Sequence, residues 1–227
     1  MHHRYDSMKH LYIVINRLRI IVRRVKVHLI KMLFERSRAK KEIETDIHRW
    51  IRMNAPALSG NTIFEKLTWL LYADHMEEFR NLFYYRIGSP ARSLDRFLLF
   101  LSRSFFKPLQ SLFISSTSIG AGLVIKHGFG TVIEAEKIGE NCLIFQDVVI
   151  GYKNDIDDRP TIGNYVHVSV GSKVLGNITI GDHAVIAANS VVTRDMPPNS
   201  LAVGIPARII RDAGNKAEYI ASGEIPA

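Results

Sequence analysis

Histidine is the residue type in this sequence that most readily carries chemistry near neutral pH. The ordinary pKa of its imidazole is about 6.5, so the ring takes up and releases a proton under physiological conditions. The chain contains nine histidines. Among them, His127 stands next to Gly128 and close to Gly130, and glycine lets backbone and ligand approach closely. We therefore treat His127 as a candidate general base and interpret His167 and His183 as bystanders.

Other features of the sequence limit the classes of function. It contains no glycine-rich phosphate loop and no dinucleotide-binding fingerprint. The single cysteine, Cys142, has no partner for an internal disulfide, which fits a reducing cytosol. The longest stretch without Asp, Glu, Lys or Arg, residues 108–125, contains polar residues and predicts no membrane span, and no signal peptide is expected. An apolar content of 47% and a charged content of 23% predict a globular protein.

The positive charge is concentrated in one segment. Residues 1–41 hold twelve Lys/Arg against Asp6 and Glu35, a net +10, whereas the remainder of the chain carries a net −2. We expect residues 16–41 to form a basic amphipathic helix that lies on an anionic membrane surface. The alternative is a helix that packs inside an oligomer with its basic face in water. Nucleic acid is not expected as a partner, because no recognition motif accompanies the charge.

The first hundred residues have the periodicity of helices. Apolar residues recur every three or four positions, first at Leu18, Ile21, Val22, Val25, Leu29, Met32 and Leu33. Further helices are predicted over residues 41–53, ending before Pro56, over a segment that Asn61 caps, over 77–87 and over 93–106.

After residue 111 the period changes to six. Residues recur at steps of six, with one step of seven and one interruption, at Ile119, Ile125, Thr131, Ile138, Ile144, Ile150, Ile162, Val168, Val174, Ile180, Ile186 and Val192. This period fits a repeat in which three short strands close each triangular coil of a parallel β-helix, with these side chains pointing to the axis. A β-sandwich is the alternative, but it requires alternation and turns about every 8–12 residues, which the sequence lacks.

Five segments of this region carry a family resemblance: residues 122–133, 138–151, 160–163, 190–198 and 203–210. A His-Gly-X-Gly segment, a loop and a Gly-Ile-Pro-Ala-Arg ending follow one another in that order. These segments resemble the hexapeptide-repeat acetyltransferases, in particular the serine acetyltransferase-like branch, which includes polysaccharide O-acetyltransferases. The resemblance implies a left-handed parallel β-helix that assembles as a homotrimer. The expected organisation is an α-helical region over 1–110 with a basic arm at 1–41, a β-helix over 111–212 with a protruding loop at 151–161, and a tail at 213–227.

The resemblance also implies that His127 is the general base, because the matching histidine has that role in the family. Three positions depart from the family pattern. Lys126 stands where serine acetyltransferases have Asp, Arg159 where they have a loop histidine, and Leu112 where they have the carboxylate that orients the base. The group that orients the base is therefore left open among a backbone carbonyl and the acids Glu134, Asp147 and Asp157.

Acetyl-CoA is the donor that the resemblance implies. Matching positions assign groove contacts to Val170, Ala188 and Thr193, and phosphate or adenine contacts to Arg208 and Arg211, since Arg pairs well with phosphate. A metal is not expected. Hexapeptide carbonic anhydrases use two histidines five residues apart on one coil, and residues 111–212 contain no such pair.

These expectations converge on a cytoplasmic, acetyl-CoA-dependent O-acetyltransferase with a peripheral contact to the inner membrane surface. The expected acceptor is a hydroxyl of a sugar or polysaccharide precursor, bound by Lys126, Asp157 and Arg159, because Lys126 would repel the ammonium group of serine. One alternative is a serine O-acetyltransferase of cysteine biosynthesis. The other is a non-catalytic β-helix scaffold with a membrane-binding basic arm.

Overall fold

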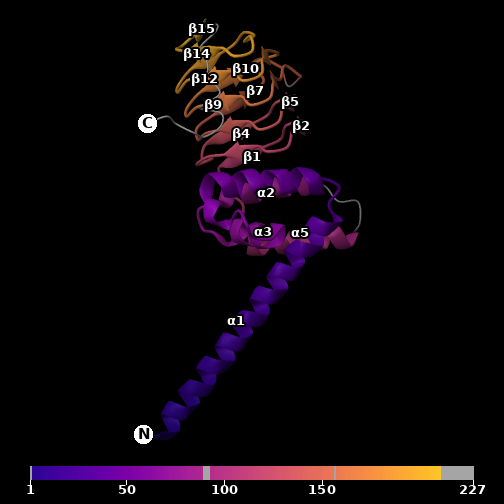
Figure 1. Cartoon of the computed structure of the whole chain (residues 1–227), viewed down its shortest axis with the longest axis vertical. Coiled ribbons are helices and arrows are strands. Elements are labelled where there is room, and N and C mark those ends of the chain that lie inside the picture. The colour runs from indigo at the N-terminus through magenta and orange to yellow at the C-terminus, as the bar shows by residue number, and fades with distance from the viewer. Residues whose placement is uncertain (1, 89–92, 156, 211–227) are drawn as a thin grey trace.

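The computed structural model describes residues 2–88, 93–155 and 157–210 (Figure 1). A layer of helices covers one end of a β-solenoid, and the first helix runs away from the body (Figure 1). The helices are α1 (His2–Arg36), α2 (Lys40–Asn54), α3 (Ile63–Tyr72), α4 (Glu77–Ile87) and α5 (Ser93–Phe105), with a short 3₁₀ helix, η1, at Pro56–Leu58. None of the helices in the described ranges combines the length and the apolar character that crossing a membrane requires.

The predicted helices are confirmed, because each buries an apolar stripe of its sequence. At the C-terminal end of α1 the buried residues are Leu29, Ile30, Leu33 and Phe34. One detail of the prediction is wrong, since Thr62 rather than Asn61 caps α3. The Thr62 hydroxyl accepts a hydrogen bond from the Glu65 N–H at 3.3 Å, and the Glu65 carboxylate accepts one from the Thr62 N–H at 2.9 Å. This reciprocal pair is a capping box.

The helical layer is followed by short strands that wind into a solenoid. They are β1 (Leu112–Ile114), β2 (Ser118–Ile119), β3 (Val124–Ile125), β4 (Thr131–Ile133), β5 (Lys137–Ile138), β6 (Leu143–Ile144), β7 (Val149–Gly151), β8 (Thr161–Ile162), β9 (His167–Val168), β10 (Lys173–Leu175), β11 (Thr179–Ile180), β12 (Val185–Ile186), β13 (Val191–Val192), β14 (Leu201–Val203) and β15 (Arg208–Ile210). Their parallel sheets have the orders β1-β4-β7-β10-β13, β11-β8-β5-β2 and β15-β14-β12-β9-β6-β3, and only β15 is antiparallel to its neighbour among these described strands. The predicted fold, a parallel β-helix preceded by a helical region, is confirmed.

The interior of the solenoid contains the residues that the six-residue period selects. All twelve ladder side chains are buried, and the small residues Ser172, Ala184 and Ser190 fill the narrow space between them with no exposed surface. Aliphatic burial at every coil stabilises the stack, while neighbouring coils pair their backbones about 4.8 Å apart. Function is therefore left to corners, loops and the outer faces.

The strand register corrects one ladder position. Ile125 pairs with Ile144, and Ile133 rather than Thr131 pairs with Ile150. From Ile125 to Ile133 is eight residues, whereas from Ile144 to Ile150 is six. Thr131 is buried as well, so its burial fits the period of six although its register does not. The first coil therefore has two additional residues at this corner.

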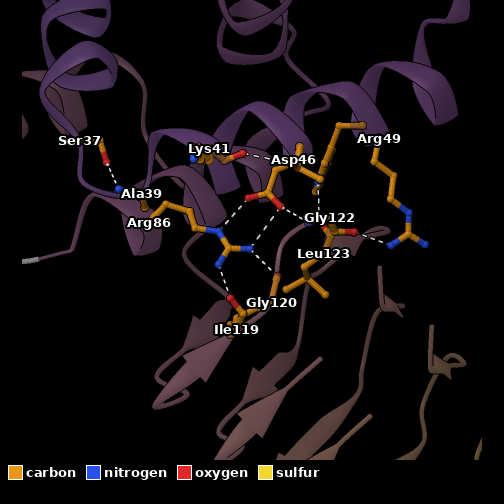
Figure 2. A network of polar contacts seen from close by, with 12 residues as sticks. Ser37, Ala39, Lys41, Asp46, Arg49, Arg86, Ile119, Gly120, Gly122 and Leu123 are labelled. Atoms are coloured by element: carbon orange, nitrogen blue, oxygen red, sulfur yellow. Dashed lines mark hydrogen bonds and ion pairs between the residues drawn. The ribbon is translucent and has the colours of Figure 1, made fainter. Parts of the chain in front are cut away.

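A buried ion pair joins α2 and α4 to the first coil (Figure 2). Arg86 Nε donates to Asp46 Oδ2 at 2.8 Å, and the other guanidinium nitrogens donate to the carbonyls of Ile119 and Gly120. Asp46 Oδ1 accepts a hydrogen bond from the Gly122 N–H at 2.6 Å. Burial raises the pKa of Asp46, while the Arg86 guanidinium and the Gly122 N–H oppose that shift.

Two more side chains of α2 hold the same coil. The Trp50 indole donates to the Leu123 carbonyl at 2.8 Å. The Arg49 guanidinium donates to the carbonyl of Gly122 (Figure 2) and, at 3.0 Å, to that of Cys142. The helical layer is thus fixed to the coil in which the insertion lies.

Candidate active site

His127 lies at the corner between β3 and β4, the edge at which the strands of the sheet β1-β4-β7-β10-β13 begin. Before this residue, the Lys126 N–H donates to a carbonyl of the next coil at 2.8 Å, and after it the Phe129 carbonyl accepts from the next coil at 3.0 Å. Because the ladder is in register on both sides, the two additional residues of the first coil are His127 and Gly128. His127 has a positive φ of 52°, and its side chain is exposed. The insertion therefore presents an imidazole to solvent.

Both neighbours of His127 are held by the helical layer. Lys126 Nζ donates to Asn54 Oδ1, at the end of α2, at 2.7 Å. The Gly128 N–H donates to Glu78 Oε1, in the first turn of α4, at 3.0 Å. Burial lowers the pKa of the Lys126 ammonium, and the Glu78 carboxylate opposes this shift. The base is thus presented between two contacts that helices supply.

A side chain at position 128 would crowd three neighbouring side chains. A Cβ on Gly128 would lie 2.9 Å from Ile125 Cγ2, 3.0 Å from Glu78 Cγ and 3.1 Å from Leu112 Cδ2. These distances also establish that Leu112 and Glu78 both reach the turn that carries His127. Leu112 is the position at which the resembling family has its orienting carboxylate.

A column of residues continues from the insertion along the same edge. N–H groups of the following coils donate to the carbonyls of Phe129, Gln146 and Val170 at 2.9–3.0 Å, so these residues and Ala188 stack in successive coils. The structure therefore brings two of the predicted groove contacts, Val170 and Ala188, to the edge at which His127 lies.

Gln146 is a residue of this column that the sequence reading did not select. Its side-chain Oε1 is buried and has no hydrogen-bond partner in the part of the chain that the structure describes. A buried acceptor without a partner is costly unless a further group supplies a donor. Its position two residues after Ile144 in the ladder is the signal that identifies it.

The other predicted contacts lie at the opposite edge of this sheet. Because its strands are parallel, they begin at one edge and end at the other. His127 precedes β4, whereas Thr193 follows β13, and Asp157 and Arg159 lie in the loop that follows β7. Thr193 and Asp157 are exposed and Arg159 is partly buried. One chain therefore does not bring these three residues to its own His127.

The acids expected near the base are also divided between the two edges of this sheet. Glu134 follows β4 at the opposite edge, where its Oε1 accepts a hydrogen bond from the Ser115 hydroxyl at 2.8 Å. Asp147 shares the edge of His127, and its Oδ1 lies over the Cα of Gly130. The carboxylate that bonds to the His127 turn is Glu78, which no sequence pattern indicated.

An open cavity of about 950 Å³ lies over the last coil. Its lining includes Thr179, Arg194, Met196, Pro197, Ile205 and Arg208. Two guanidinium groups and a hydroxyl suit the phosphates of a nucleotide, because Arg forms paired hydrogen bonds with phosphate oxygens. Arg208 is thus in a position that fits the predicted phosphate contact. Arg211 and the expected tail at 213–227 lie outside the described residues.

The remaining solenoid histidines have aromatic neighbours. His167 is buried and stacks on Phe145, with ring centroids 5.2 Å apart, and His183 stacks on Tyr165 at 4.9 Å. Among the described residues, no group of three His, Cys, Asp or Glu side chains has the arrangement of a metal site.

Comparisons with known sequences show that this solenoid is similar to bacterial transferases. Residues 159–194 match the model "Bacterial transferase hexapeptide (six repeats)". The serine acetyltransferase of Synechococcus elongatus is 42% identical over 111 residues, which cover 48% of this chain and 46% of that protein. The serine acetyltransferase of Helicobacter pylori (strain 26695) is 45% identical over 95 residues, or 40% of this chain and 56% of that protein. The chain thus spans about half the length of the curated relatives it matches.

Solved structures extend the likeness to the helical layer. A serine acetyltransferase in complex with cysteine matches 87% of this chain and 75% of its own, with a TM-score of 0.60 and 26% identity. A serine acetyltransferase in complex with CoA matches 81% of this chain and 75% of its own, with a TM-score of 0.57 and 27% identity. The chain therefore carries the hexapeptide repeat of bacterial transferases and shares the fold of serine acetyltransferases.

Proposed function

We propose that this protein is an acetyl-CoA-dependent O-acetyltransferase in which His127 is the general base. The observation that carries the proposal is the exposed imidazole on a two-residue insertion, held on both sides by the helical layer. In the reaction the acceptor hydroxyl oxygen attacks the thioester carbonyl while His127 takes the hydroxyl proton. The carbon–sulfur bond then breaks, and the same proton passes from the imidazolium to the departing CoA thiolate.

The donor fits the edge that begins at His127. Val170 and Ala188 continue this edge with small side chains. The edge is about 14 Å long from β4 to β13, because these strands are three coil spacings apart. The cavity over the last coil adds Arg208 for the phosphates, because Arg208 pairs with Val203 where β14 ends, at the edge of His127. An extended molecule with a thioester at one end and phosphates at the other matches this distribution. A related structure with bound CoA gives independent support.

For the acceptor, the comparisons favour L-serine over the sugar that the sequence reading preferred. The relatives are serine acetyltransferases, and one solved structure is a complex with serine. The argument that Lys126 repels the serine ammonium also weakens, because Lys126 Nζ is bonded to Asn54 and partly buried. A carbohydrate hydroxyl is the second candidate, because Leu112 and Lys126 replace the two acids that serine enzymes have beside the base.

Assembly with neighbouring copies is part of the proposal. His127 lies at one edge of the sheet, and the loop with Asp157 and Arg159 lies at the other. A second chain docked edge to edge supplies this loop to the first chain's His127, and a closed ring of three gives every base such a neighbour. We therefore propose a homotrimer with sites between subunits, which sedimentation analysis tests. A fully active monomer would contradict it.

The experiment that tests the activity measures thiol release from acetyl-CoA with a panel of acceptors. L-Serine should be acetylated with kcat/KM of about 10⁴ M⁻¹s⁻¹ or more, and His127→Ala should lower kcat by about 10²–10⁴. His183→Ala is the matched control, because His183 stacks on Tyr165 away from the insertion. Turnover of sugars alone selects the second candidate. No turnover with any acceptor, or an active His127→Ala variant, refutes the proposal.

We also propose that α1 and α5 form a surface that docks on an anionic membrane. Helix α1 extends beyond the body (Figure 1), and the apolar stripe that is buried from Leu29 onward is exposed along this extension. The exposed apolar residues of this docking surface are Ile15, Leu18, Val22 and Val25 on α1, and Leu94, Phe97 and Phe100 on α5, which packs against α1. Of the residues 16–41 expected from sequence, only the part of α1 before Leu29 is therefore available to a membrane, because the apolar residues from Leu29 onward pack against the body.

The positive charge around this docking surface favours an anionic membrane over a second copy of the helix. Between Asp6 and Glu35 the chain has no acidic residue, and Arg17, Arg19 and Arg24 are exposed beside the apolar stripe. A second copy of α1 on this stripe brings like charges together without an acid to offset them. Anionic headgroups neutralise these charges while the apolar residues enter the interface.

Vesicle flotation tests this contact with the whole chain. The protein should float with phosphatidylglycerol-containing vesicles and not with pure phosphatidylcholine. Arg17→Glu/Arg24→Glu should abolish flotation, whereas Lys41→Glu/Lys137→Glu, which changes the net charge equally, should retain it. Equal recovery with both lipids, or equal losses in both variants, would overturn the membrane proposal.

A further inference from the structure

We infer that Glu78 is the carboxylate that positions His127, in place of the acid that the resembling family has at the position of Leu112. The inference rests on the proposed function for its catalytic readout. Its structural basis is the one carboxylate–turn contact described above, in which Glu78 Oε1 accepts the Gly128 N–H at 3.0 Å. Glu78 belongs to the helical layer, and His127 to the solenoid.

The neighbours of Gly128 show how Glu78 can take the place of an acid at position 112. Leu112 Cδ2 and Glu78 Cγ both lie within 3.1 Å of the place where a Cβ on Gly128 would be. The two side chains therefore contact the same turn from two elements, β1 and α4. The side chain of Leu112 has no polar atom, so the polar contact to the turn comes from α4.

Glu78 lies near the N-terminal end of its helix. It lies in the first turn of α4, where the helix macrodipole stabilises a negative charge. Its bond to Gly128 is therefore charge-assisted, and such hydrogen bonds are about twice as strong as neutral ones. The neighbouring Glu77 makes a different contact, to Arg80 at 3.8 Å, so only Glu78 reaches the turn.

The bond acts on a backbone that needs support. His127 has a φ of 52°, in the left-handed region that non-glycine residues rarely adopt. Lys126 is fixed to Asn54 on one side, and Gly128 is fixed to Glu78 on the other. With Glu78 removed, the turn is free to relax, and the imidazole spends less time in the orientation that transfers a proton.

The experiment compares Glu78→Ala and Glu78→Gln with the control Glu77→Ala. Glu78→Ala should lower kcat about ten- to hundredfold, with KM for acetyl-CoA and acceptor within about twofold, which is the range expected for a lost charge-assisted hydrogen bond. Glu78→Gln should recover most of kcat, because its amide oxygen still accepts the Gly128 N–H. Glu77→Ala should leave kcat unchanged.

Hydrogen exchange supplies a readout that does not depend on activity. The Gly128 amide should exchange faster in Glu78→Ala than in Glu78→Gln or the wild type. Wild-type kcat in Glu78→Ala, or a Glu78→Gln variant as impaired as Glu78→Ala, would overturn the inference. If His127→Ala is inactive while Glu78→Ala is fully active, this inference alone fails. If His127→Ala is active, the proposed function fails.

Discussion

Replacing Asp46 with alanine should destabilise the protein far more than the loss of an exposed ion pair does. The Asp46 and Arg86 side chains are only 2% and 4% exposed. Without the carboxylate, the Arg86 cation remains buried with no counter-charge from Asp46, and its hydrogen bonds go to the carbonyls of Ile119 and Gly120. Removing one partner of such a pair costs about 3–5 kcal/mol. For a chain of this length, that lowers the melting temperature by about 6–20 °C.

The assay is urea and thermal unfolding at one fixed protein concentration, because assembly makes the melting temperature concentration-dependent. Asp95→Ala is the control, since Arg36 and Asp95 form a pair that is 35% and 15% exposed, and its loss should cost far less than the loss of the buried pair. Asp46→Leu/Arg86→Met should recover much of the lost stability, because the uncompensated charge is gone. A loss in Asp46→Ala no larger than in Asp95→Ala would refute the reasoning.

The same variant should also slow turnover at temperatures where it is folded. Asp46 and Asn54 both lie on α2, and Glu78 and Arg86 both lie on α4. The buried pair therefore holds together the two helices that fix the turn of His127. Asp46→Ala should reduce kcat together with stability, whereas Asp95→Ala should leave kcat unchanged.

Three further predictions concern single residues. Gly128→Ala should lower kcat and cost about 1–3 kcal/mol of stability, because the added Cβ contacts three side chains at 2.9–3.1 Å; unchanged kinetics and melting would show that the turn has room. Thr62→Ala should cost about 1 kcal/mol in urea unfolding through loss of the α3 cap, and an unaltered midpoint would argue against the capping box. Burial raises the pKa of the Cys142 thiol from its ordinary 9.0 to about 11, so thiol reagents should label it at pH 8 only after unfolding. Between those two pKa values the thiol ionises in the unfolded chain but stays protonated in the folded one. The free energy of unfolding should therefore fall with rising pH, relative to Cys142→Ala, by up to about 1.4 kcal/mol per pH unit. Parallel curves of stability against pH for the two proteins would contradict this.

The sequence predicts the solenoid because its signal is local and repeated. A buried aliphatic residue recurs at each coil, and each coil packs only on its neighbours, so the pattern survives without knowledge of the rest of the fold. The helices of the first part are predicted for a similar reason, since each shows its apolar stripe within one turn or two. His127 can also be identified as a candidate from its local sequence, because glycines lie beside it.

The insertion at His127 shows where local periodicity misleads. Thr131 follows Ile125 by six residues and is buried, so it satisfies the pattern. Backbone pairing nevertheless aligns Ile133 with Ile150. A period records which residues are buried, whereas register is decided by hydrogen bonds between coils. Only those bonds reveal that two additional residues push the imidazole outward.

The contacts that hold the base depend entirely on tertiary structure. Glu78 and Asn54 lie on helices about 50 and 70 residues before the solenoid residues that they bond, and nothing in their local sequence marks them. They reach the turn because Asp46, Arg86 and the first coil dock the helical layer in one orientation. The sequence by itself determined the repeat, the helices and the candidate base, since each follows from burial along a short segment. Which carboxylate meets the turn, and which predicted contacts lie at opposite edges, was decided by the packing of distant segments, because hydrogen-bond partners are set by distance in space and not by spacing along the chain.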